Sequence, residues 1–234
     1  SQFNLGNYQK LNATLKDFEK FCDSNFVLQN DDNLIQCFIY HTISQLNKHF
    51  LTGNFSDGLL LVEGIEEKLK EYEIYLDRHR ILVIYYKIAS MYFGTGNYET
   101  AIDYLNKIIN WKVDLRNDLQ CYARLLHLIA HYELGNYQLL EYLAKSVYRF
   151  MAKMQNLSVV EEEMFKFLRK ALTLNARQLK PEFEKLLGKL KQFENKRFET
   201  RAFMYLDMIS WLESKINNVP VQKIIQQKYL SKKQ

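Results

Sequence analysis

Two histidines have the spacing at which side chains of one helix come together on a metal ion. His127 and His131 are four residues apart in a stretch with helical apolar periodicity, so both rings are expected on one face of a helix. A zinc site needs at least a third protein ligand, and only Glu133 lies close in sequence. The HExxH pattern is not present. We therefore favour a pair of surface or interfacial histidines and predict no metal site.

The other residues with chemical potential also have structural explanations. Glu161, Glu162 and Glu163 follow Ser158 at the spacing of a capping box, and acidic side chains in the first turn of a helix interact favourably with its dipole. We interpret this run as a solvated helix start. The chain has no Walker motif, no GxGxxG and no GxSxG. These observations predict a protein that is not an enzyme and binds no cofactor.

The three cysteines fall within apolar helical stretches. Cys22, Cys37 and Cys121 form no CxxC pair and lie near no histidine at ligand spacing, so each is expected to be a small buried hydrophobe. Free cysteines suit a reducing compartment, and we expect a cytoplasmic protein. No apolar run approaches the roughly 20 residues that span a bilayer, so no membrane span is predicted.

A tripeptide of glycine, asparagine and an aromatic residue recurs along the chain. It occurs at residues 6–8, 53–55, 96–98 and 135–137, and the intervals between the glycines are 47, 43 and 39 residues. Glycine adopts the left-handed conformation that ends a helix, and asparagine tolerates the turn that follows. The aromatic residue is then expected to pack back across the corner. With only two prolines and eight glycines in the chain, this pattern predicts an all-α fold built from αα-hairpins.

The stretch from Tyr85 to Ile109 resembles the tetratricopeptide repeat. Tyr85, Ile88, Ala89, Tyr92, Gly96, Tyr98, Ala101, Ile102 and Leu105 fall on the spacing of that family's pattern. The other units match less well, since leucine replaces the small residues. The resemblance implies a right-handed superhelical array of antiparallel αα-hairpins. Residues 1–154 would hold degenerate repeats, the first of them truncated, which suggests further repeats or another domain upstream.

The glycine signature stops after residue 154, and the remaining helices are expected to continue the same array. Residues 155–234 would add one more hairpin and a helical C-terminal cap. Pro181 is suited to the first position of a helix, residues 198–216 have helical periodicity, and Pro220 would start a short final helix.

The resemblance also implies a binding surface, because in tetratricopeptide arrays the first helix of each hairpin lines a concave groove. Carried over to this chain, the groove would be lined by Tyr40, Asn47, Phe50, Tyr86, Phe93, Tyr122 and Tyr132. A row of aromatic side chains suits apolar residues of a peptide or helix. The alternative is that these rings are buried between hairpins.

These observations favour a non-catalytic scaffold that binds a protein or peptide partner, or a second copy of the chain. Residues 180–234 carry twelve Lys and Arg against six Asp and Glu, and Lys196, Arg197 and Arg201 cluster beside Phe198. Basic residues near aromatics can hold nucleic acid through phosphates and stacking, but no recognition motif accompanies them. Nucleic-acid binding is therefore the disfavoured alternative. Another is the peptide-sensing domain of a transcriptional regulator whose DNA-binding part lies upstream.

Overall fold

The described part of the chain folds into helices. The computed structural model describes residues 8–111, 117–155, 157–193 and 207–231, and no strand occurs among them, which confirms the all-α prediction. The helices are α1 (Tyr8–Cys22), α2 (Asn25–Leu28), α3 (Asp31–Thr52), α4 (Phe55–Leu59), α5 (Val62–Glu71), α6 (Arg78–Thr95), α7 (Tyr98–Ile109), α8 (Asn117–Glu133), α9 (Tyr137–Lys153), α10 (Val159–Ala171), α11 (Ala176–Lys191), α13 (Met208–Asn217) and α14 (Val221–Ser231).

Glycine ends three of these helices, as the repeated tripeptide predicts. Gly53, Gly96 and Gly135 have φ angles of 68°, 88° and 72°. After α6, the N–H of Gly96 donates to Phe93 and that of Asn97 donates to Tyr92, the bond pair of a Schellman motif. Gly6 lies outside the described residues.

An aromatic pair spans each of the three turns. The aromatic two residues after the glycine packs on the one three residues before it, which confirms that it packs back across the corner. The ring centroids are 5.1 Å apart for Phe50 and Phe55, 5.2 Å for Phe93 and Tyr98, and 6.2 Å for Tyr132 and Tyr137. Each pair joins the end of one helix to the start of the next, so it fixes the angle of the hairpin.

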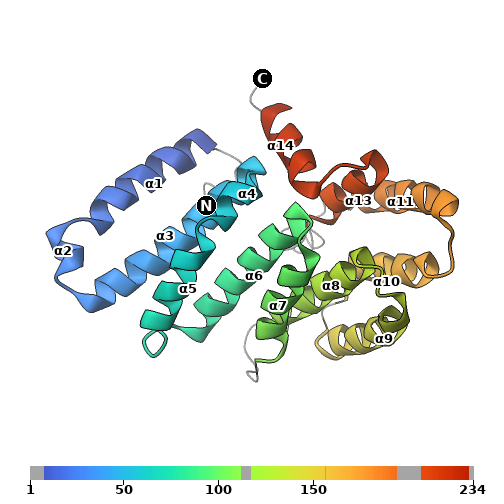
Figure 1. Cartoon of the computed structure of the whole chain (residues 1–234), viewed down its shortest axis with the longest axis horizontal. Helices are drawn as coiled ribbons and strands as arrows, with labels where there is room; N and C mark the ends of the chain where they lie inside the picture. Colours follow the sequence, from blue (N-terminus) through green and yellow to red (C-terminus); the bar gives the residue numbers. More distant parts are fainter. Residues whose placement is uncertain (1–7, 112–116, 156, 194–206, 232–234) are drawn as a thin grey trace.

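Successive helices pack side by side around one core. Helix α6 packs on α7, α7 on α8 and α8 on α9, as Figure 1 shows. Ala89 and Ala101, the small residues of the third unit, are both fully buried. A continuous hydrophobic core extends from Ile35 in α3 to Val221 in α14. Burial of apolar side chains of this size contributes roughly 1.5–3 kcal/mol each, so this core supplies the main stabilisation of the hairpins.

The C-terminal helices fold back over earlier helices. Helix α14 contacts α3 and α6, and Figure 1 shows α13 and α14 crossing from α11 toward α4. A Cβ on Gly53 would lie 2.5 Å from the backbone nitrogen of Gln226, so the bare glycine permits this close approach. Ser56 also donates to the side chain of Gln222 at 3.2 Å. The C-terminal helices thus contact α3 and α6 as well as their neighbours in sequence.

Trp211 anchors α13 to the rest of the core. Its indole is 1% exposed, and its ring lies 6.3 Å from that of Tyr132 and 5.9 Å from that of Phe183. Its Nε1 donates to the Glu133 carboxylate at 2.6 Å, and Lys215 Nζ lies 2.7 Å from the same group. The end of α8 is thereby joined to α13.

Several local predictions can be compared directly with the helix boundaries. The Ser158–Glu161 capping box is present, but Glu161 is 1% exposed, so the predicted solvated start is wrong for that residue because the cap draws its carboxylate inward. Pro181 lies inside α11, since a capping box of Asn175 and Gln178 starts the helix earlier. Helix α14 begins directly after Pro220, as predicted. Of the helix predicted over 198–216, residues 198–206 lie outside the described residues.

Two of the cysteines are buried, as the apolar pattern predicts. Cys37 and Cys121 are buried, Cys22 is partly buried, and all three are free thiols. Burial, with a hydrogen bond to Cys37, raises the pKa of the Cys22 thiol to about 12. A thiol with so high a pKa is a poor nucleophile at neutral pH.

Candidate functional site

Four of the seven residues predicted to line a groove lie in the core. Tyr86, Phe93, Tyr122 and Tyr132 are all buried, so these rings present no surface to a partner. Tyr132 shows the reason, because Trp211 of α13 and Phe167 of α10 pack against it. The sequence left burial between hairpins open as an alternative, and these four rings are buried in that way.

The other three groove residues lie on α3 and contact α6. Asn47 accepts a hydrogen bond of 2.6 Å from Lys87, whose ammonium group also lies 5.3 Å from the Phe50 ring centroid. Burial lowers the pKa of Lys87 to about 8. The Tyr40 hydroxyl accepts from Arg80 at 3.3 Å. These three residues therefore have partners within the chain and hold α3 to α6.

The two histidines lie together, as their spacing predicts. Their ring centroids are 4.5 Å apart, and His131 Nδ1 is 3.0 Å from the Asn136 side chain. Burial, His131 and the Arg124 charge lower the pKa of His127 to about 4. Within the described residues, no group of three His, Cys, Asp or Glu side chains could hold a metal ion.

The lowered pKa of His127 predicts acid sensitivity. In the unfolded chain the pKa of His127 returns to its ordinary value near 6.5. Between pH 6.5 and 4 the unfolded state therefore binds a proton that the folded state does not, and the free energy of unfolding falls as the pH drops through this range. We expect about 1 kcal/mol of this loss by pH 5, discounted for partial exposure. Urea unfolding of the parent and of His127→Gln at pH 7, 6 and 5 measures it. Equal pH dependence in the two proteins would contradict the assignment.

The basic cluster predicted from the sequence cannot be compared with the structure in the same way. Lys196, Arg197 and Arg201 lie outside the described residues.

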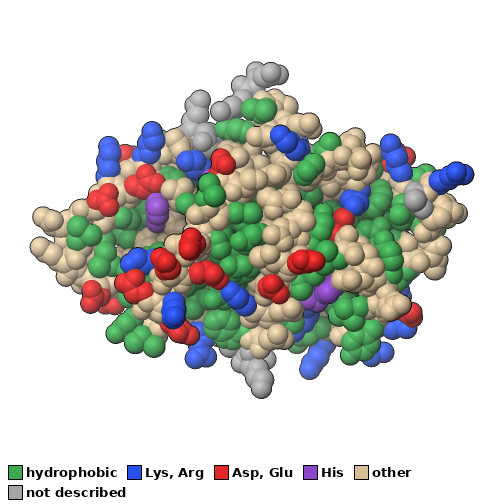
Figure 2. Space-filling view, viewed as in Figure 1, with side chains coloured by type: hydrophobic (Ala, Val, Ile, Leu, Met, Phe, Trp, Pro, Cys, Tyr) green, Lys and Arg blue, Asp and Glu red, His purple; other side chains and the backbone are tan. Residues whose placement is uncertain are grey.

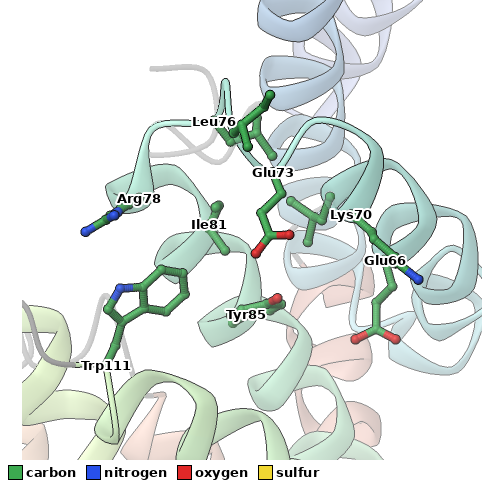
Figure 3. A pocket seen from close by; sticks show the side chains of 10 residues that line it. Glu66, Lys70, Glu73, Leu76, Arg78, Ile81, Tyr85 and Trp111 are labelled. Atoms are coloured by element: carbon green, nitrogen blue, oxygen red, sulfur yellow. The ribbon is translucent and has the colours of Figure 1, made fainter.

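An open cavity lies between α5, the start of α6 and Trp111, the second residue after α7. It has a volume of about 810 Å³, and Figure 3 shows its lining side chains. Apolar and aromatic residues form its walls, and charged residues stand among them. The lining residues are Glu66, Leu69, Lys70, Glu73, Ile74, Leu76, Arg78, Ile81, Tyr85 and Trp111.

The turn between α5 and α6 forms the rim of this cavity and exposes apolar side chains. Ile74 is 82% exposed and the neighbouring Tyr75 is 67% exposed. Backbone hydrogen bonds to Tyr72 hold the turn, and Asp77 caps the start of α6. Large apolar side chains at the edge of a cavity are typical of a surface that another molecule covers.

A further cation, in addition to Lys70 and Arg78 of the lining, lies beside Glu66. Lys107 Nζ lies 2.8 Å from the Glu66 carboxylate and 5.1 Å from the Tyr85 ring centroid. Burial alone would raise the pKa of Glu66, but the hydrogen bonds from Lys107 and Tyr104 hold it below its ordinary value. Burial raises the pKa of Tyr85, and the charges of Glu66 and Glu73 add to that rise. Lys107 therefore links the Glu66 carboxylate to the Tyr85 ring at the edge of the cavity.

Sequence reasoning did not find this site. The residues could be seen in the turn 72–77, where Ile74 and Tyr75 lie between Glu73 and Asp77, and in Trp111, two residues after the last apolar position of a helix. Neither signal specifies a cavity until the fold brings the turn and Trp111 together, with α7 packed on α6 and the Lys107–Glu66 ion pair joining α7 to α5.

Comparisons of the chain with family models, curated proteins and solved structures found no match. None of the described helices is both long enough and apolar enough to span a bilayer. The cavity lining combines six apolar or aromatic residues with four charged ones, so it offers a ligand both apolar and charged contacts.

Proposed function

We propose that the protein is a non-catalytic scaffold that binds a segment of a partner protein in the cavity between α5, α6 and Trp111. The observation that carries this proposal is a cavity of about 810 Å³ whose rim residue Ile74 is 82% exposed. An extended or helical segment would bury Ile74 together with the Trp111 and Tyr85 rings. Aromatic residues in such partly buried positions are frequent binding hot spots.

We further infer that the hairpins are degenerate tetratricopeptide-like repeats in a right-handed superhelical array, continued by the C-terminal helices, in a cytoplasmic protein. The Schellman turns at Gly96 and its counterparts support this, as do the buried Ala89 and Ala101 where α6 and α7 approach. The proposed binding surface differs from the groove predicted by the resemblance, because Tyr86, Phe93 and Tyr132 are enclosed by the chain itself.

The proposal predicts that Ile74→Asp weakens binding of the partner. A charge on the rim would lose the apolar contact, and we expect at least about a 30-fold loss, corresponding to roughly 2 kcal/mol for a hot spot. Tyr142→Asp is the matched control, since Tyr142 is 72% exposed on α9 and does not line the cavity. The measurement is capture from source-cell lysate, with the captured protein then purified and titrated against each variant.

Melting temperatures of both variants must equal that of the parent chain for this comparison to hold. Equal affinity of the Ile74→Asp and Tyr142→Asp proteins for the captured partner would place the interface elsewhere and refute the proposed site.

A further inference from the structure

One carboxylate in the cavity has no counter-charge. In Figure 3 the Glu73 carboxylate points toward Tyr85, between Trp111 on one side and Glu66 on the other. Its side chain makes no hydrogen bond or ion pair with the described residues, whereas Glu66 is bound by Lys107. Glu73 is exposed, and a carboxylate without a protein partner is open to a charge-assisted hydrogen bond from a cation.

The surrounding charges do not neutralise Glu73. Residues 62–73 hold five glutamates and two lysines. The first of the two lysines, Lys68, is already paired with Glu71 at 2.6 Å. Lys70 and Arg78 lie at opposite ends of the cavity in Figure 3, on either side of the Glu73 carboxylate. Figure 2 shows acidic side chains over α5 and α7, with Lys and Arg side chains among them. The lining thus carries two acidic and two basic residues, and within the described part of the chain neither Lys70 nor Arg78 forms an ion pair with Glu73.

The aromatic walls favour the same kind of ligand. The Tyr85 and Trp111 ring centroids are 6.5 Å apart, and Tyr85 already has the Lys107 ammonium group 5.1 Å from its ring. Trp111 has no cation over its ring among the described residues, and tryptophan is the side chain that holds cations best. Leu76 and Ile81, which also line the cavity, would contact the aliphatic stem of a long basic side chain.

We propose that the cavity binds a lysine or arginine side chain of a partner peptide, with its charged end between the Glu73 carboxylate and the Trp111 ring. This inference rests on the proposed function and names the chemistry of the partner. The volume of about 810 Å³ exceeds that of one side chain, so the apolar neighbours of the basic residue would fill the remainder, next to Ile74.

The two tryptophans make the inference directly measurable. Trp111 lines the cavity, whereas Trp211 is 1% exposed and does not, so its indole is an internal control. The probes are acetyl-LRLRL-amide, acetyl-LQLQL-amide and acetyl-LELEL-amide, which match in length and apolar content. In ¹H–¹⁵N spectra of the full chain, we expect the arginine peptide to shift the Trp111 indole resonance and to leave that of Trp211 in place.

The matched variants are Glu73→Gln and Glu63→Gln, each of which removes one carboxylate charge. Glu63 lies within α5, and Glu73 lies just beyond its end. Glu63 does not line the cavity. We expect Glu73→Gln to weaken the arginine peptide roughly tenfold, the loss typical of a charged hydrogen bond, and Glu63→Gln to change its affinity less than about twofold.

Each contrary outcome has a separate meaning. Equal binding of the glutamine and arginine peptides at Trp111, or equal affinity of Glu73→Gln and the parent chain, would overturn the cation inference while leaving the proposed peptide site intact. If no peptide shifts Trp111, the inference is also overturned. The proposed function fails by a different measurement, the unchanged partner affinity of Ile74→Asp.

Discussion

Replacing Gly53 by alanine is expected to lower the free energy of unfolding by about 3 kcal/mol, whereas the same change at Gly96 costs about 1 kcal/mol. Both glycines have positive φ, so both substitutions strain the backbone. At Gly53 the new Cβ would also lie 2.5 Å from the backbone nitrogen of Gln226 and 2.7 Å from the carbonyl oxygen of Gln222. At Gly96 no such atom lies within 4 Å.

Urea unfolding of the two variants, followed by far-UV circular dichroism, measures the difference. Because the backbone strain is common to both, the excess loss at Gly53 reports the contact between the α3–α4 turn and α14. Equal losses at the two positions would show that α14 is not held against Gly53. Faster hydrogen exchange in α14 of the Gly53→Ala protein would localise the effect.

Trp211→Ala is expected to destabilise the protein by roughly 3–5 kcal/mol, the range for removing a large aromatic side chain from a core. The substitution leaves a void among Tyr132, Phe167 and Phe183 and removes the donor to the Glu133 carboxylate. That carboxylate is 5% exposed, so its lost hydrogen bond is not replaced freely by water.

Chemical unfolding of Trp211→Ala, Trp211→Phe and Trp111→Ala separates these contributions. Trp211→Phe keeps an aromatic ring and loses the indole N–H, so it is expected to cost about 1–3 kcal/mol. Trp111→Ala is expected to cost the least, because its partly exposed ring lines an open cavity. A Trp211→Ala protein as stable as Trp111→Ala would mean that α13 is not part of the cooperative core.

The hairpin turns were predictable from the sequence because their determinants are local. Gly96 and Asn97 satisfy the last carbonyls of one helix and start the next within two residues, whatever the rest of the chain does. The same holds for the capping box at Ser158 and Glu161. Each of these features is decided by residues in the same turn, so a short window of sequence suffices.

The division between groove and core was not predictable, because distant residues decide it. Tyr132 follows the spacing of a groove position, yet Trp211 covers it from 79 residues further along the chain. The α5–α6 cavity was missed for the same reason. Glu73, Tyr85 and Trp111 belong to three separate segments, and no periodicity within one segment shows that they meet.

The return of α14 to α3 has a consequence for how the chain acquires its structure. Contacts between successive hairpins form early because the partners are close in sequence, but Ser56 and Gln222 are 166 residues apart. At ordinary rates of synthesis, on the order of ten seconds separate the emergence of α3 from that of α14. During that interval the Gly53 turn stands uncovered on the nascent chain. Folding is therefore completed only when the last helices have left the ribosome, and a chain shortened before residue 221 would lose contacts at α3 as well as at its end.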